Sequence, residues 1–213
     1  MILTTEEREA ARWHEPLKLQ GHGLTLTALG ADDAADFLAA LGTPEESAEV
    51  LAHLTHPPPV DLAAATEIIR SAVDDQDRLA YAQRLSETGE LVGTTSYYEI
   101  RPSLRALAIG HTWVARRHWR TFVNTASKLI MLERAFDGLG AERVVWHTDI
   151  RNVRSQTAIA RLGAVREGVL RHHRIRRDGS WRDTVQFSML ADEWPEVRRR
   201  LLARLDSRAD QGD

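Results

Sequence analysis

The stretch LAIGHTWVARRHWRTFVNTASK, residues 107–128, decides the fold. It predicts a buried strand over 107–114, a basic turn over 115–123, and then a helix that begins at Asn124 or Thr125. At such a junction the free N–H groups of the first helical turn and the helix dipole favour an anion. Either of the two starting residues can cap the helix through its side chain. The turn adds three cations: Arg116, Arg117 and Arg120. The stretch therefore predicts a site for a phosphate group.

The composition is that of an ordinary soluble globule. The chain has 213 residues, of which 43% are hydrophobic and 28% charged, and its formal net charge is −3. This charge gives no reason to expect nucleic acid as a partner. With no cysteine, disulfides, Cys–zinc sites and a thiol nucleophile are excluded. No apolar run approaches the ~20 residues of a membrane span and no signal-peptide pattern is present, so we expect a cytoplasmic enzyme or binding protein with no membrane partner.

The remaining pattern predicts a single α/β (α+β) domain. We expect a helical appendage over 1–20, the domain over 21–205, and a polar, disordered tail over 206–213. Within the domain, helices come first, followed by a three-strand meander and then strand, helix, strand, helix and hairpin. This order predicts a mixed sheet with helices on both faces. The strands 107–114 and 143–148 are joined by a crossover helix, which makes them parallel.

Three pairs of segments carry a family resemblance. Ile109-Gly110-His111 with Trp113-Val114 resembles the fourth strand of the GNAT acetyltransferases, within their RimJ/RimL-like group. The segments 152–155 and 158–164 resemble the N-x-x-S…LGF segment of that group, and 167–171 with 178–183 resembles its EGxLR…DGxxxD ending. Together they extend the resemblance over roughly Gly21 to Pro195.

The resemblance implies a GNAT fold whose central sheet is splayed between the fourth and fifth strands. It also implies acetyl-CoA as co-substrate, no metal, and direct transfer to a primary amine in a ternary complex. The amine then belongs to a small molecule or to a protein N-terminus. By this resemblance, the coenzyme-binding residues are Trp113, Val114, Arg116, Arg117, Arg120, Thr121, Phe122, Val123, Asn124, Thr125 and Asn152.

Two departures from the group favour an alternative function. The phosphate turn of the group usually carries Gly-x-Gly, and here Arg120 and Phe122 occupy those places. Side chains there crowd a backbone that must approach a pyrophosphate closely. The acidic residue common before Ile-Gly on the fourth strand is Ala108. The alternative is a GNAT-like CoA-binding or regulatory module with little or no transferase activity.

Ser155 is the candidate general acid, because by the resemblance it reaches the coenzyme sulfur. The competing interpretation is a polar residue in the first turn of its helix. Asn152, three residues earlier, can cap that helix and bond the pantetheine at the same time.

The candidate general base is Glu99 or His111. Because side chains alternate between the two faces of a strand, Tyr97, Glu99 and Arg101 are expected to share one face. A half-buried Glu99 can have a raised pKa and attract a cationic amine, although an Arg-paired or solvated carboxylate fits equally well. His111 has a suitable intrinsic pKa, but the group usually has Tyr there, which favours a packing role.

The acceptor site is the least defined part. Tyr97 and Asp149 are candidate substrate contacts, with a surface carboxylate as the alternative for the latter. Trp181 is expected to wall the acceptor pocket or to make a dimer contact, and a homodimer stays open. The histidines show no HExxH spacing, and no metal site is expected.

Overall fold

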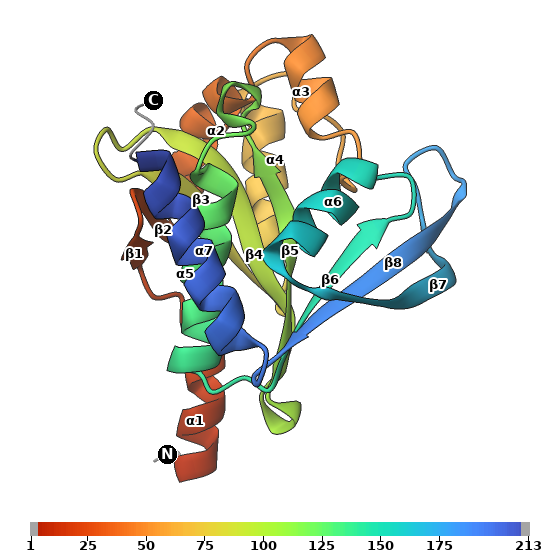
Figure 1. Ribbon diagram of the computed structural model, residues 1–213. Coiled ribbons are helices and arrows are strands. Elements are labelled where there is room, and N and C mark those ends of the chain that lie inside the picture. Colours follow the sequence, from red (N-terminus) through yellow and green to blue (C-terminus); the bar gives the residue numbers. More distant parts are fainter. Residues whose placement is uncertain (1–3, 210–213) are drawn as a thin grey trace.

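The computed structural model describes residues 4–209, and a mixed sheet of eight strands forms its centre (Figure 1). The strand order is β1-β2-β3-β4-β5-β6-β8-β7. Every neighbouring pair is antiparallel except β5–β6, which is parallel, as the crossover helix predicted. The strands are β1 Leu19–Gly21, β2 Leu24–Ala28, β3 Arg78–Leu85, β4 Leu91–Arg101, β5 Ala106–Val114, β6 Arg143–Asp149, β7 Val165–Ile175 and β8 Trp181–Leu190.

Helices cover both faces of the sheet. One hydrophobic cluster joins the sheet to α5, α6 and α7, and a second joins its other face to α2, α3 and α4. Figure 1 shows α5 and α7 side by side on the near face, with α2 and α4 behind the sheet. The helices are α1 Thr5–Trp13, α2 Ala34–Leu41, α3 Pro44–Val50, α4 Leu62–Asp74, α5 Val123–Glu133, α6 Val153–Leu162 and α7 Trp194–Ala209.

Local sequence explains several helix ends. The Asp61 carboxylate accepts a hydrogen bond from the Ala64 amide at 2.8 Å and so caps α4. Thr43 and Glu46 form a capping box at the start of α3. Gly163, with φ of 105°, ends α6 in the left-handed conformation that glycine adopts most easily.

Two bulges interrupt the pairing of β4 with β5. His111 on β5 has a φ of 49° and Glu99 on β4 has a φ of 48°, and the register shifts beside each of them. A bulge inserts one residue and reverses the facing of all that follow. Ile109 packs in the α5 cluster, whereas Trp113 packs in the α2–α4 cluster. The β5 bulge thus exchanges the two faces of the strand midway along it.

The β5–β6 ladder ends soon after it begins. Only three residue pairs join the two strands, from Ala106↔Arg143 to Ala108↔Val145. Beyond Ala108 the two strands separate, as Figure 1 shows. The predicted splay between these strands and the mixed α/β sheet with helices on both faces are confirmed.

The domain boundaries differ from those expected. The supposed appendage is tied into the domain, because Trp13 is 6% exposed and Leu19–Gly21 form β1. The Arg134 guanidinium donates to the carbonyl of Glu15 at 2.6 Å, at the end of α1. At the other terminus α7 continues to Ala209, so residues 206–209 are helical. The rest of the predicted tail, 210–213, lies outside the described residues.

Candidate functional site

The basic turn leads into α5 earlier than predicted. The helix begins at Val123 and its N-cap position is Phe122, so Asn124 and Thr125 lie in the first turn and do not cap it. Thr121 stabilises this start, because its hydroxyl donates to the His118 carbonyl at 2.8 Å and accepts from the Val123 amide at 3.4 Å. No described side chain caps the helix from the N-cap position, which leaves the first turn suited to an anionic ligand.

Two arginines of the turn, Arg116 and Arg117, form ion pairs with local carboxylates. Arg116 donates to Glu49 at 2.6 Å and Arg117 donates to Glu90 at 2.6 Å. Both guanidinium groups are about half exposed, so these ion pairs are weak. Each arginine can therefore exchange its carboxylate partner for a phosphate. Arg120 is exposed and has a φ of 66°. It therefore takes the left-handed backbone conformation with an arginine where the resembled group has glycine.

The Phe122 ring points toward the edge of the sheet that β1 and β2 form. A Cβ added at Gly23, in the turn between β1 and β2, would lie 3.1 Å from the ring carbon Cε2. The ring packs against the α5 cluster there. β1 and β2 are separated from β6 by three further strands, so the Phe122 side chain is directed away from the splayed strands.

Aromatic and cationic groups connect the turn to α6. The Trp119 indole donates to the Val114 carbonyl at 2.8 Å, and the Arg154 guanidinium lies 3.8 Å from the centre of its ring. Arg154 stands in the first turn of α6, so this cation–π contact links the two sides of the splay. Trp113 is buried and meets the Phe37 ring edge-on at 5.0 Å, which directs it toward α2.

The start of α6 carries two of the predicted site residues. Asn152 is the N-cap, as predicted, and its side-chain oxygen accepts from the Ser155 amide at 3.0 Å. Ser155 is half-buried, and within residues 4–209 its hydroxyl has no hydrogen-bond partner. The hydroxyl is therefore available to a ligand.

A polar bridge crosses the splay on the α2–α4 face. The Tyr98 hydroxyl, from β4, lies 3.0 Å from Nδ1 of His147, from β6. Gly110 lies under the Tyr98 ring, since a Cβ there would be 2.6 Å from the ring carbon Cε1. The other imidazole nitrogen lies 3.0 Å from the Gln186 amide oxygen. The bridge thus joins β4 to β6 and β8, and it crosses β5 in the part of that strand that does not pair with β6.

The bulge separates Tyr97 from Glu99, contrary to the shared face that strict alternation predicted. Tyr97 is fully buried under α5, where its hydroxyl donates to the Met131 carbonyl at 2.6 Å. The structure does not bring it to the other site residues. Glu99 instead lies 3.8 Å from His147 Nδ1 and 3.6 Å from the Arg174 guanidinium. Its side chain is 37% exposed, which leaves it open to an incoming amine.

His111 lies in a cationic environment beside this bridge. Its ring meets the Tyr98 ring edge-on at 5.1 Å. Burial, together with the charges of Arg78, Arg174 and Arg182, lowers the pKa of His111 to about 3. The imidazole is therefore neutral near pH 7 and a weak base, which favours the packing role.

Asp149 is buried and already engaged, so the surface-carboxylate interpretation is wrong. It is 4% exposed and forms a two-pronged ion pair with Arg176 at 2.6 and 2.8 Å. Hydrogen bonds from Arg176 and the Arg151 amide outweigh burial and hold its pKa below the usual value. Trp181 lies at the start of β8, 55% exposed, with its ring stacked on His172 at 5.2 Å.

Sequence reasoning missed several residues that the fold gathers here. They are Tyr98, His147, Arg78 and Arg182, together with His56 from the loop after α3. The alternation of side chains along β6 could have identified His147, because this residue lies on the same face of the strand as Val145 and the predicted site residue Asp149. No local signal marks the others, since their neighbours come from strands distant in the sequence.

The chain belongs to the GNAT acetyltransferases. Residues 23–165 match the acetyltransferase (GNAT) domain family. A candidate acetyltransferase from T. thermophilus is 35% identical over 91% of this chain and 99% of its own, with a TM-score of 0.81. A GCN5-related N-acetyltransferase from Brucella melitensis is 26% identical over 90% and 86% of the two chains, with a TM-score of 0.85. No curated protein matches the sequence.

A RimJ protein shows the same fold at lower identity. Mycobacterium smegmatis RimJ, solved in complex with CoA-disulfide, is 22% identical over 89% of this chain and 95% of its own, with a TM-score of 0.70. GNAT acetyltransferases use acetyl-CoA, and the splayed strands beside the uncapped start of α5 fit that co-substrate. Within residues 4–209, no cluster of metal-binding side chains is found and no helix is long and apolar enough to cross a membrane.

Proposed function

We propose that the protein is an N-acetyltransferase that transfers acetyl from acetyl-CoA directly to a primary amine while both substrates are bound. The observation that carries the proposal is the β5–β6 ladder, which ends after three pairs. The separated strands leave backbone groups free for the pantetheine arm, and the first turn of α5 would receive the pyrophosphate. The segments around Asn152 and Glu167, together with the RimJ fold likeness, support placement near the RimJ/RimL group.

The chemistry requires a neutral amine and a proton for the departing thiolate. At pH 7, deprotonation costs about 4–5 kcal/mol for a lysine side chain and about 1–1.4 kcal/mol for an α-amine. Glu99 is the base that the site offers, because it is partly exposed and lies beside the bridge. The Ser155 hydroxyl, on the opposite flank of the splay, is the proposed proton donor to the coenzyme sulfur.

Calorimetry with acetyl-CoA and with CoA tests the coenzyme site directly. Binding of both is expected, and the proposal would be removed if neither acetyl-CoA nor CoA bound at millimolar concentration. A CoA-release assay across proteins, peptides, polyamines and aminoglycosides then tests transfer. Turnover on any amine would reject a module that only binds CoA.

The Ser155→Ala variant tests the proposed general acid. We expect kcat to fall about 10²-fold, in the range typical of lost acid–base catalysis, with CoA affinity changed less than about threefold. Thr157→Ala, at an exposed position of the same helix, is the matched control. An unchanged kcat for Ser155→Ala would assign the residue a purely structural place in α6.

A further inference from the structure

Two partly buried arginines beside the Tyr98–His147 bridge form no ion pair with a carboxylate in the described part of the chain. Arg78 is on β3 and Arg182 is on β8, and both are half-buried. Among the described residues, neither guanidinium lies within the 4.0 Å of a carboxylate oxygen that defines an ion pair. The Nε atom of Arg182 is buried with no hydrogen-bond partner in that part of the chain. By contrast, Arg116, Arg117, Arg174 and Arg176 each lie against a carboxylate.

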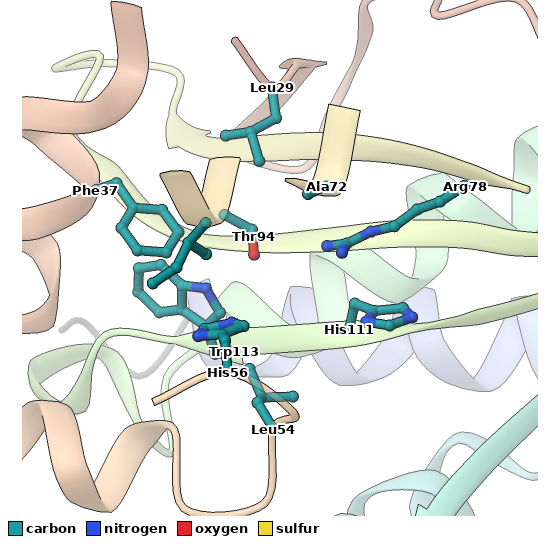
Figure 2. A pocket seen from close by; sticks show the side chains of 10 residues that line it. Leu29, Phe37, Leu54, His56, Ala72, Arg78, Thr94, His111 and Trp113 are labelled. Atoms are coloured by element: carbon teal, nitrogen blue, oxygen red, sulfur yellow. The ribbon is translucent and has the colours of Figure 1, made fainter. Parts of the chain in front are cut away.

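Arg78 reaches into a small cavity. Its Nε donates to the Ser96 hydroxyl at 2.8 Å, and its guanidinium lines a space shared with His56, Thr94 and His111. Figure 2 shows the guanidinium extended along β4, with the His111 ring on the neighbouring strand. The cavity volume is about 20 Å³, enough for a group the size of a water molecule. Burial lowers the pKa of Arg78 only to about 10, so it stays charged at neutral pH.

The surrounding groups leave the local charge positive. Glu99 lies against Arg174 and Asp149 is paired with Arg176. Asp149 also attracts Arg182 and Asp75 attracts Arg78, but within residues 4–209 neither carboxylate forms an ion pair with these two arginines. His56 and His111 both have pKa values lowered by burial, and they add little charge at neutral pH. Arg78 lines the same cavity as His111, and Arg182 on β8 is in register with Arg174, whose guanidinium lies 3.6 Å from Glu99. The two arginines therefore approach the Tyr98–His147 bridge from opposite parts of the sheet.

A half-buried guanidinium with no anion is unfavourable, because it gives up hydration without gaining a partner. Arginine is also the side chain that best matches a carboxylate, through two parallel hydrogen bonds. A ligand carboxylate in this place would satisfy both requirements.

We infer that the acceptor is a primary amine that also carries a carboxylate, which Arg78 and Arg182 bind while the amine faces Glu99. This inference rests on the proposed function and specifies its substrate class. The carboxylate comes either from a free amino acid or from an acidic side chain near a peptide N-terminus. Polyamines and aminoglycosides, which carry only positive charge, are disfavoured at this site.

Matched acceptor pairs test the inference through the CoA-release assay. The pairs are α-amino acids against their amides, and C-terminally amidated tetrapeptides with Glu against Gln at the second position. We expect kcat/KM to be at least tenfold higher for the carboxylate member of one pair, which also identifies the source. Equal values in both pairs, or a preference for spermidine, would overturn the inference while leaving acetyl transfer intact.

Variants assign the preference to the two arginines. Arg78→Gln and Arg182→Gln are each expected to reduce the preference at least tenfold, mainly by raising KM. Arg78→Lys, which keeps the charge but loses the paired hydrogen bonds, is expected to keep only part of it. Arg70→Gln, on the exposed surface of α4, is the control and leaves the preference unchanged. Loss of the preference in Arg70→Gln as well would show that the effect comes from net charge.

A binding measurement makes the test independent of turnover. Calorimetry of the CoA-saturated protein with N-acetylglutamate and with its diamide compares a carboxylate product with a neutral one. We expect the acid to bind at least tenfold more tightly, and Arg78→Gln to abolish the difference. Equal affinities would overturn the inference. Failure to bind CoA would instead overturn the proposed function, and the acid–diamide comparison is then made on the protein without CoA.

Discussion

Gly110 is the residue on which the bridge across the splay depends. The Tyr98 ring lies so close over it that an added Cβ would be 2.6 Å from a ring carbon. The Tyr98 hydroxyl reaches His147 on β6 only because nothing projects from β5 at this point. The absence of a side chain therefore has a steric purpose here.

Gly110→Ala is expected to lower the free energy of unfolding by about 1–3 kcal/mol, as overpacking usually does. Acetyl transfer should fall as well, because the Tyr98 ring must move away from His147. Chemical denaturation and the CoA-release assay measure the two effects. Adding Tyr98→Leu should recover stability without activity, and a fully stable and active Gly110→Ala protein would contradict the steric role.

Lys128 is a buried amine that has no carboxylate partner among residues 4–209. It is 5% exposed, and its Nζ donates to the hydroxyls of Thr95 at 2.9 Å and Thr112 at 2.7 Å. Burial lowers its pKa to about 7. Thr112 follows the His111 bulge, so this contact fastens α5 to β5 where that strand exchanges its faces.

The lowered pKa of Lys128 predicts that stability rises with pH. An unfolded lysine has a pKa near 10.4, so between pH 7 and pH 10 the unfolded chain binds more protons than the folded one. The free energy of unfolding should then increase by about 2 kcal/mol from pH 7 to pH 9, before tyrosines begin to ionise. Denaturation curves across this range measure the slope. Lys128→Met should remove it, and an equal slope in both proteins would refute the assignment.

At the scale of elements, the turn into α5 replaces the glycines of the resembled group with side chains. Arg120 holds a φ of 66°, a conformation that costs an L-residue about 1 kcal/mol more than glycine. Holding Arg120 in this conformation therefore costs the folded turn a small amount of stability.

Comparing Arg120→Gly with Arg120→Ala isolates this backbone cost, because both variants lose the same guanidinium. We expect the glycine variant to be more stable by about 0.5–1 kcal/mol, as judged by thermal or chemical unfolding. CoA affinity should be at least equal in the glycine variant. An alanine variant that is as stable as the glycine one would show that the turn relaxes to another conformation.

The elements with clear periodicity were predictable from the sequence, and the positions that depend on one backbone angle were not. The strands predicted over 107–114 and 143–148 are found as Ala106–Val114 and Arg143–Asp149. The bulge at Glu99 has no local sequence signal. Strict alternation along the strand therefore predicted, wrongly, that the Glu99 side chain lies on the same face as Tyr97. Likewise, the contact of Tyr98 with His147 joins residues 49 apart and needs the assembled sheet.

At the scale of the whole molecule, the sheet consists of two parts with a weak connection. Strands β1–β5 and β6–β8 are joined in the sheet by only three parallel pairs. The Tyr98–His147 bridge and the Arg154–Trp119 contact supplement them. A ligand between β5 and β6 would therefore contact both parts and restrict their relative motion.

Coenzyme binding is accordingly expected to stabilise the chain and to protect the separated strands. CoA at 100 times its Kd should raise the free energy of unfolding by about 2.7 kcal/mol, if only the folded state binds it. Hydrogen exchange should slow most in residues 109–114 and 146–149, where the β5–β6 ladder is absent. Residues 24–28 in β2 are the internal control and should change little. Protection confined to the α5 turn, with 146–149 unaffected, would mean that the coenzyme does not enter between the strands.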